Sequence, residues 1–380
     1  MMFFLLLLGI IFLLLSPKLF LLAYLAINAF TSNYDDRSIK LFNYLVFFYL
    51  SMTLSIMLAD RPYYIGEEVG FGDDMLHYYH AFEWVVNSSF KDFFSEFYMI
   101  TSLTGSSEPV FWFIVKLIGL IIRDPYYIHV FLTFFGCLLI FIAGEVWNKK
   151  GLLFLFFYTN TITFFAFQGS AVRSGLAFSF ALLGYVLFYK RNNKWFYFLP
   201  PFIHYSLIPF SVITYISNIN FKNKKSLLRF IFFSIIFAFS FLLLVSNSLD
   251  SGLGRKLESR FSEDIMNFSA LLQFLIESIF TIVIINTIFK DKVDKKLKLS
   301  LIYFFILSLL IVFVSPSIFS RFYRYEYILL ILIYASIYEL SRPAVRFFIL
   351  LFSFSWYLFL GYSRFIGVFS EDVFAYINFL

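Results

Sequence analysis

Charged side chains are scarce in this sequence. They make up 14% of its 380 residues, about half the share found in ordinary soluble domains. Cys137 is the only cysteine, so the chain can form neither an internal disulfide nor a cysteine-based metal site. The glycine motifs that bind nucleotide phosphates are absent as well. These absences exclude a cytosolic enzyme, a secreted disulfide-rich protein, a nucleic-acid-binding protein and an enzyme with a nucleotide-sugar domain.

Apolar residues dominate instead. They account for 61% of the chain, with 59 phenylalanines and 26 tyrosines. Apolar blocks that approach the roughly 20 residues of a spanning helix recur from Met1 to Leu360. Because backbone polar groups in lipid must bond within helices, we predict an all-α, polytopic integral membrane protein. We expect a single membrane domain over residues 1–380, with about 10–12 transmembrane or re-entrant helices.

Two long polar loops interrupt the apolar blocks. Residues 60–107 carry eight acidic and two basic side chains, a net charge of −6, and residues 246–268 form the second loop. Because basic loops tend to stay in the cytoplasm, we predict that both are extracytoplasmic. The stretch DDMLHYYHAFEWVVNSSFKDFFSEF, Asp73 to Phe97, reads as an amphipathic helix that lies along the membrane interface. The first apolar block lacks a basic start and a cleavage site, which favours a retained helix over a removed signal peptide.

The positions of lysine and arginine constrain how the chain threads through the membrane. The N-terminal half agrees with the positive-inside rule only if two apolar blocks do not cross. One is a short segment between residues 108 and 143. The other is residues 195–217, where consecutive prolines and His204 favour a re-entrant hairpin from the cytoplasmic side. With this threading, Arg173 lies at the outer face.

Arg173 and His204 are polar residues whose positions in apolar blocks call for an explanation. Arg173 opens such a block, and it is either an anchor at the interface or a fixed charge that holds a phosphate or pyrophosphate head group. An intramembrane histidine indicates a functional site. The alternative for His204 is a core histidine bonded to a carbonyl group that Pro201 or Pro209 leaves free.

A second basic cluster occurs late in the chain, in SRFYRYEYI. Arg321 and Arg324 are three residues apart, so in a helix they share one face. Tyrosine and arginine are also common in interfacial belts. Together with Arg173 at the same face, the cluster would suit a dianionic head group.

Three carboxylates are candidates for general-base work, which requires a carboxylate within hydrogen-bond reach of the attacking hydroxyl. They are Asp73 and Asp74 in the first loop and Glu108 at a helix start. Asp73 or Asp74 is equally suited to cap the helix that begins there. A metal site formed by Asp73, His77 and His80 on one helix face is a further alternative, but no additional ligand is identifiable.

The order of these segments resembles the EpsG-like branch of the bacterial Wzy-type polysaccharide polymerases. The resemblance rests on VGFGDDMLHYY, SSEPVFWFIVKLI, GSAVRSGLAFSFALLGYVLF and FIHYSLIPF, and later on SRFYRYEY. It covers residues 69–210, with a weaker similarity over residues 321–327. The acidic element departs from the family pattern, because two aspartates follow Gly72 and leave open which of them matches.

The resemblance implies a polymerase for O-antigen, capsular polysaccharide or exopolysaccharide in the bacterial inner membrane. Such an enzyme joins oligosaccharide repeat units carried on undecaprenyl pyrophosphate, with its active site at the outer face. It transfers the growing glycan from lipid pyrophosphate to a sugar hydroxyl. The resemblance implies no cofactor and no metal. It implies two partners besides the lipid bilayer, namely the lipid-linked glycan and a protein that regulates chain length.

The resemblance also implies roles for individual residues. Asp73 or Asp74 would be the base, Glu108 a second carboxylate and His204 a supporting acid/base or hydrogen-bond partner. The pyrophosphate-binding residues would be Arg173, Arg321 and Arg324, because neutralising the charge of the leaving group favours transfer.

Three other functions fit the same features. An integral membrane glycosyltransferase that uses a polyprenyl-phosphate sugar would look alike and would differ only in its product. A lipid-linked oligosaccharide flippase or other transporter usually shows two similar halves, and no internal repeat is visible here. A structural partner subunit would tolerate replacement of Arg173 and His204.

Overall fold

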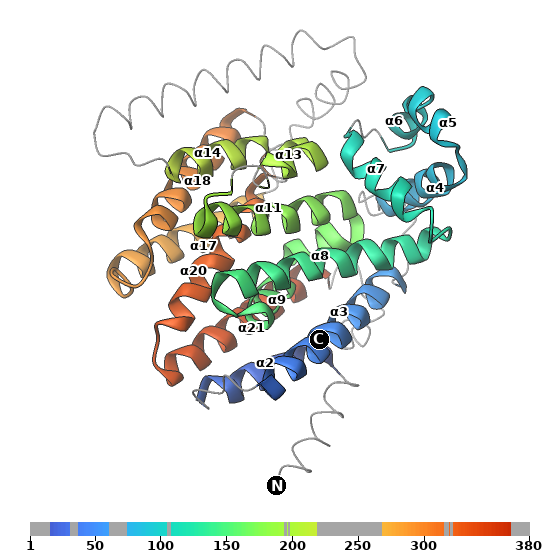
Figure 1. Ribbon diagram of the computed structural model, residues 1–380. Coiled ribbons are helices and arrows are strands. Elements are labelled where there is room, and N and C mark those ends of the chain that lie inside the picture. The colour runs from blue at the N-terminus through green and yellow to red at the C-terminus, as the bar shows by residue number, and fades with distance from the viewer. Residues whose placement is uncertain are drawn as a thin grey trace.

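The computed structural model describes residues 16–30, 37–60, 74–104, 108–193, 196, 198–218, 268–314, 319 and 322–365. Every regular element within these residues is a helix (Figure 1), which confirms the predicted all-α fold. Four helices are long and apolar enough to cross a membrane: Lys40–Asp60 within α3 (Arg37–Asp60), α8 (Pro125–Asn148), α11 (Val172–Arg191) and Ala270–Thr287 within α17 (Phe268–Thr287). The predictions for residues 1–15, Asp73, Arg321 and the loop 246–267 lie outside the described residues.

The long helices differ in what surrounds them. In α11, 83% of the spanning window is buried by the rest of the protein, whereas in α3 and α17 the share is 39%. The exposed side chains of α3 and α17 are apolar: Leu45 and Phe48 are 59% and 57% exposed, and Leu272 and Val283 are 47% and 52% exposed. An apolar outer surface of this extent is expected where lipid is the solvent. The chain is therefore a polytopic membrane protein with α11 at its centre.

Helix α8 defines the two ends of the bundle. Near its N-terminus, Tyr126 donates a hydrogen bond to Asp60 of α3, with 2.7 Å between the oxygens. At its C-terminus, the Lys190 ammonium lies 4.4 Å from the centre of the Trp147 ring. We call these the Glu108 end, after the residue discussed below, and the Lys190 end. Lys149, which follows α8, and Lys190, near the end of α11, lie at the same end of the bundle. The chain between α8 and α11 must therefore run back to the Glu108 end before α11 begins.

The return passes through a broken helix. It consists of α9 (Gly151–Thr159), α10 (Ile162–Phe164) and the π-helix η1 (Phe165–Ser170). The break frees the carbonyl group of Thr159, and the buried Lys18 of α2 (Pro17–Phe30) donates to it from 2.9 Å. Irregular backbone inside a membrane is tolerated where neighbouring groups satisfy it in this way.

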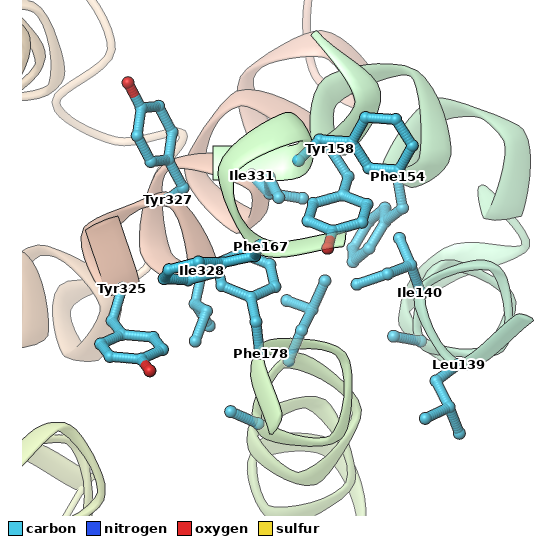
Figure 2. Close-up of a cluster of buried hydrophobic side chains, with 14 of the residues drawn as sticks. Leu139, Ile140, Phe154, Tyr158, Phe167, Phe178, Tyr325, Tyr327, Ile328 and Ile331 are labelled. Atoms are coloured by element: carbon cyan, nitrogen blue, oxygen red, sulfur yellow. The ribbon is translucent and has the colours of Figure 1, made fainter. Parts of the chain in front are cut away.

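An aromatic core surrounds the break (Figure 2). Tyr158 of α9 stacks on Phe178 of α11 with 5.0 Å between ring centres. The ring centres of Phe167 in η1 and Tyr325 in η3 (Tyr323–Tyr325) are 5.4 Å apart. The turn η3 precedes α20 (Glu326–Glu339). Aromatic pairs at this spacing contribute about 0.5–1.5 kcal/mol each beyond their buried area. They fix the start of α11 against η1 and η3.

Four short helices gather beside the N-terminal end of α8 (Figure 1). They are α4 (Asp74–Asn87), α5 (Phe90–Ser95), α6 (Tyr98–Thr104) and α7 (Pro109–Ile118). The predicted amphipathic helix is present as α4 but ends at Asn87, because Ser89 caps a new helix by accepting the backbone N–H of Asp92. With ten residues, α7 is about 15 Å long and too short to span. Its length agrees with the prediction that one segment between residues 108 and 143 does not cross, and the threading itself stays a prediction.

The second irregular segment consists of α13 (Pro200–Ile203), the 3₁₀ turn η2 (Tyr205–Leu207) and α14 (Ile208–Asn218). The break falls at His204, whose backbone is extended. In Figure 1, α13 lies toward α7 and α14 toward α18 (Lys295–Val314), where Phe210 and Phe304 are in ring contact at 5.8 Å. Among the described residues α13 has four residues and α14 eleven, and the re-entrant hairpin stays a prediction.

The C-terminal helices α17, α18, α20 and α21 (Pro343–Phe365) close the bundle. A buried polar cluster joins three of them. Glu277 of α17 accepts hydrogen bonds from Tyr327 of α20 at 2.7 Å and from the indole of Trp356 in α21 at 2.6 Å. A buried carboxylate requires such donors, so the cluster fixes the relative positions of α17, α20 and α21.

The turn between α8 and α9 generates a prediction about stability. A Cβ atom on Gly144 would lie 2.6 Å from the carbonyl oxygen of Lys150 and 2.8 Å from Cα of Gly151, and backbone atoms cannot rotate away. We expect Gly144→Ala to lower the free energy of unfolding by about 1–3 kcal/mol, measured by thermal unfolding in detergent. The control is Gly119→Ala, whose nearest contact is the side chain of Val86 at 2.9 Å, which can move. Equal effects of the two changes would contradict the packing described for Gly144.

Candidate functional site

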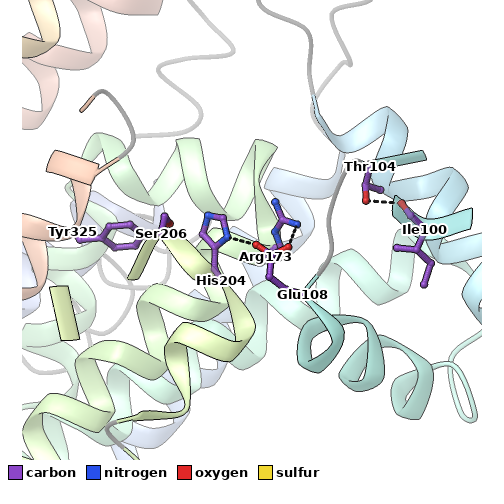
Figure 3. A network of polar contacts seen from close by, with 7 residues as sticks. All are labelled: Ile100, Thr104, Glu108, Arg173, His204, Ser206 and Tyr325. Atoms are coloured by element: carbon purple, nitrogen blue, oxygen red, sulfur yellow. Dashed lines mark hydrogen bonds and ion pairs between the residues drawn. The ribbon is translucent and has the colours of Figure 1, made fainter. Parts of the chain in front are cut away.

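Three polar side chains from distant parts of the sequence meet at the Glu108 end of the bundle (Figure 3). One carboxylate oxygen of Glu108 accepts a hydrogen bond from Nη1 of Arg173 at 2.6 Å. The other lies 2.9 Å from Nδ1 of His204. The side chains are nearly enclosed, with 7% of Glu108, 12% of Arg173 and 13% of His204 exposed. The contacts join residues separated by 65 and 96 positions.

Each of these side chains stands at a break in the helical backbone. Glu108 precedes Pro109 and has extended backbone at the start of α7, because a residue before proline disfavours the helical region. Its side chain does not cap its own helix. Arg173 is the second residue of α11, the helix that follows the π-helix η1. His204 is the extended residue between α13 and η2. Local backbone geometry thus turns all three side chains toward one point.

The charges determine which groups donate and which accept. An ionised carboxylate only accepts hydrogen bonds, so Nδ1 of His204 carries the proton it shares with Glu108. A neutral His204 then has its lone pair on Nε2. The guanidinium of Arg173 remains charged at every accessible pH. The site therefore combines a permanent cation, a carboxylate and an oriented imidazole.

A second group of residues lies beside this contact. The hydroxyl of Ser206 is 2.7 Å from that of Tyr325, and the guanidinium of Arg324 lies 5.7 Å from the centre of the Phe167 ring. Nε of Arg324 is buried and has no hydrogen-bond partner among the described residues. Burial raises the pKa of the Tyr325 phenol, while Arg173 lowers it and Glu108 raises it further. The phenol therefore stays neutral next to two charged groups.

The structure brings three of the seven predicted site residues into direct contact and leaves the side chains of three others undescribed. Glu108, Arg173 and His204 are in direct contact, and Arg324 stands next to Tyr325 at the edge of the same group. Asp74 is the first residue of α4, and its side chain is not among those described. Asp73 and Arg321 lie outside the described residues. The roles assigned to all of them in binding or catalysis stay predictions.

The structure bears on two alternatives that the sequence left open, the core histidine and the metal site. His204 has a carboxylate at Nδ1, where the core-histidine alternative expects a carbonyl group. His77 and His80 of the metal alternative are exposed on α4. Among the described residues, no group of three histidine, cysteine or acidic side chains is arranged to hold a metal ion.

Sequence reasoning missed the residues that position η1. His129 of α8 is fully buried, and its Nε2 lies 2.8 Å from the carbonyl oxygen of Gln168. Its Nδ1 is 3.3 Å from the hydroxyl of Tyr79 in α4. His129 of α8 thus connects α4 to the π-helix η1, which precedes Arg173. The same argument that selected His204, a titratable ring in an apolar block, would have selected it.

The chain also resembles known proteins. The sequence profile of the EpsG family matches residues 63–378, which include Glu108, Arg173, His204 and Arg324. The EPS I polysaccharide export inner membrane protein EpsF of Ralstonia solanacearum is 28% identical over 138 residues, which is 34% of this chain and 31% of that protein. The EpsF protein of Ralstonia nicotianae is 29% identical over 135 residues, 33% of this chain and 30% of that protein. The match thus spans about a third of the length of these relatives. No solved structure matches the chain.

The enclosed ion pair generates a prediction about stability. Glu108→Ala leaves the Arg173 charge without its carboxylate, and breaking a buried pair in this way costs about 3–5 kcal/mol. We expect a large loss of thermal stability in detergent, with much of it recovered in the double variant Glu108→Met/Arg173→Met, which removes both charges. The control is Glu83→Ala, at an exposed position on α4, with an expected change within about 0.5 kcal/mol. If Glu108→Ala and Glu83→Ala melt alike, the pair does not stabilise the fold.

Proposed function

Because this chain belongs to the EpsG family, we propose that it polymerises lipid-linked oligosaccharide repeat units into a bacterial polysaccharide. Membership of the family and the likeness to the two EpsF proteins support a role in exopolysaccharide biosynthesis at the inner membrane. The specific proposal is glycosyl transfer from undecaprenyl pyrophosphate to a sugar hydroxyl, with an exopolysaccharide, capsular polysaccharide or O-antigen as the product. One observation carries it: Arg173, Glu108 and His204 meet at one end of a membrane bundle.

The pyrophosphate is the part of the substrate that Arg173 suits best. A guanidinium presents a planar set of donors that matches phosphate oxygens. Glu108 holds this guanidinium in place through Nη1, so its orientation is fixed before substrate binds. Arg324 and Arg321, three residues earlier in the sequence, would add positive charge. The bond from the anomeric carbon to the pyrophosphate oxygen breaks, and these cations stabilise the negative charge that the leaving lipid pyrophosphate gains.

The acceptor hydroxyl must lose a proton as its oxygen bonds to the anomeric carbon. His204 is placed for this role, because Glu108 fixes the tautomer whose lone pair is on Nε2. The proton passes from the hydroxyl to Nε2, and Glu108 stabilises the imidazolium that forms. Asp73 or Asp74 is the alternative base. The reaction consumes one lipid-linked glycan and one acceptor, and releases lipid pyrophosphate without a cofactor.

The site would face the periplasm or the cell exterior, where lipid-linked repeat units are joined. The lysines at the opposite end of the bundle, Lys149, Lys150 and Lys190, favour a cytoplasmic position for that end. A chain-length regulator is the protein partner we propose.

Product analysis tests the reaction directly. The purified protein in lipid vesicles receives an undecaprenyl-pyrophosphate repeat unit from its host, with no nucleotide sugar. We expect a ladder of products spaced by whole repeat units. A single added sugar would favour a polyprenyl-phosphate glycosyltransferase, and unchanged substrate that crosses the vesicle membrane would favour a flippase. Either result would overturn the proposal.

Variants in the same assay test the residues. We expect Arg173→Ala to abolish the ladder while the protein still accumulates in the membrane, and, because this change also leaves Glu108 without its cation, we expect the double variant Glu108→Met/Arg173→Met to stay inactive although it recovers stability. His204→Ala should slow it by about 10²–10⁴-fold, the usual contribution of a positioned base. The control is Arg191→Ala, which removes an exposed arginine from the opposite end of the same helix. Near-normal activity of Arg173→Ala would remove this residue from the site.

Cysteine labelling tests the orientation. Cys137 is buried, so a membrane-impermeant thiol reagent should react only with an introduced cysteine. We expect the reagent to label Lys91→Cys, on the exposed surface of α5, from outside intact cells. Asn192→Cys, exposed after α11, should react only after the membrane is opened. The reverse pattern would place the site in the cytoplasm.

A further inference from the structure

An apolar hollow of about 380 Å³ lies between α5 and α7. Its volume falls within the range of small-molecule sites. Every residue that lines it is apolar. On the α5 side these are three phenylalanines, and on the α7 side a proline, a valine and a further phenylalanine: Phe93, Phe94, Phe97, Pro109, Val110 and Phe113.

A buried lysine holds α5 and α7, the two walls of the hollow, in a fixed relative position. Lys116 of α7 is 4% exposed, and its ammonium donates to the carbonyl oxygen of Val85 at 2.7 Å and to that of Ser88. These carbonyl groups belong to the end of α4, where a helix lacks internal partners for them. Because Ser89 caps α5 immediately afterwards, Lys116 fixes the position of α5 relative to α7. The hollow is therefore part of the folded structure and does not depend on a ligand to form.

The hollow adjoins the charged site through a single peptide bond. Pro109, which lines it, directly follows Glu108, and consecutive Cα atoms are about 3.8 Å apart. Glu108 in turn holds Arg173. The apolar lining of the hollow thus begins one residue after the carboxylate that holds Arg173. This juxtaposition fits an amphipathic ligand whose charge and whose apolar chain are joined end to end.

We propose that this hollow binds the isoprene units next to the pyrophosphate of the polyprenyl-linked substrate. This inference rests on the proposed function. The hollow differs from the outer faces of α3 and α17, which are exposed helix surfaces suited to bulk lipid, because Lys116 holds its two walls together and its lining residue Pro109 is bonded to Glu108, the partner of Arg173. Binding the first part of the chain orients the pyrophosphate toward Arg173 and His204. The bilayer solvates the remainder of the chain.

Kinetics with substrates of different chain length test this inference. The variant is Phe94→Ser, at a side chain 65% exposed, so folding should survive. Repeat units on a long polyprenyl pyrophosphate are compared with the same units on a short, water-soluble alkyl pyrophosphate. We expect Phe94→Ser to raise KM for the long substrate about tenfold, with KM for the short one and kcat for both unchanged. The control is Phe48→Ser on α3, a phenylalanine 57% exposed. Like Phe94, it makes one edge-on ring contact.

The outcomes separate this inference from the proposed function. If wild-type protein makes no ladder from either substrate, the polymerase proposal fails. If the ladder forms but Phe94→Ser changes neither KM, or both equally, the hollow does not bind the chain.

Photolabelling supplies a readout that needs no turnover. A polyprenyl pyrophosphate with a photoreactive group in its first isoprene unit, and no glycan, should label the peptide that contains residues 90–113. Unlabelled polyprenyl pyrophosphate should compete, and Val110→Trp, which fills the hollow, should abolish the labelling. Equal labelling by a photoreactive phospholipid would mean that the surface contacts only the bilayer, and would overturn the inference.

Discussion

The arrangement of this protein depends on a carboxylate held between two cationic or titratable groups inside an apolar bundle. Glu108 has little access to water and requires donors for both of its oxygens. Arg173 and His204 supply them at 2.6 and 2.9 Å. The start of α7, the start of α11 and the break after α13 must therefore meet at one point. The same contact that fixes three segments also brings a guanidinium, a carboxylate and an imidazole together at one end of the bundle.

Irregular backbone is the means by which the bundle presents these groups. Regular spanning helices satisfy their own backbone groups and direct side chains outward, whereas a break exposes polar groups that need partners. Lys18 bonds the carbonyl group freed after α9, and His129 bonds the end of η1. Lys116 performs the same task for α4. Each of these three breaks thus has a buried polar side chain that holds it in place.

Much of the fold follows from composition, and less of the site does. Apolar blocks of spanning length predict an all-helical membrane protein, the cost of placing polar groups in apolar blocks selects Arg173 and His204, and the search for a general base selects Glu108. Their mutual contact joins residues 65 and 96 positions apart, which no local pattern encodes. The break at Ser88 was missed although the polar run from Asn87 to Ser89 marks it and Ser89 carries the cap. Lys18 and Lys116 escaped notice because their partners are carbonyl groups that become available only where helices end.

The central claim is that Arg173 binds the pyrophosphate of a lipid-linked glycan. The most direct measurement is the equilibrium affinity of the protein, in lipid nanodiscs, for a polyprenyl-pyrophosphate repeat unit and for the same glycan on the uncharged polyprenyl alcohol. The account predicts that the pyrophosphate form binds more tightly. It also predicts that Arg173→Ala lowers the ratio of the two affinities at least tenfold, which is about 1.4 kcal/mol, while Arg191→Ala leaves this ratio unchanged. An unchanged preference in Arg173→Ala would contradict the account.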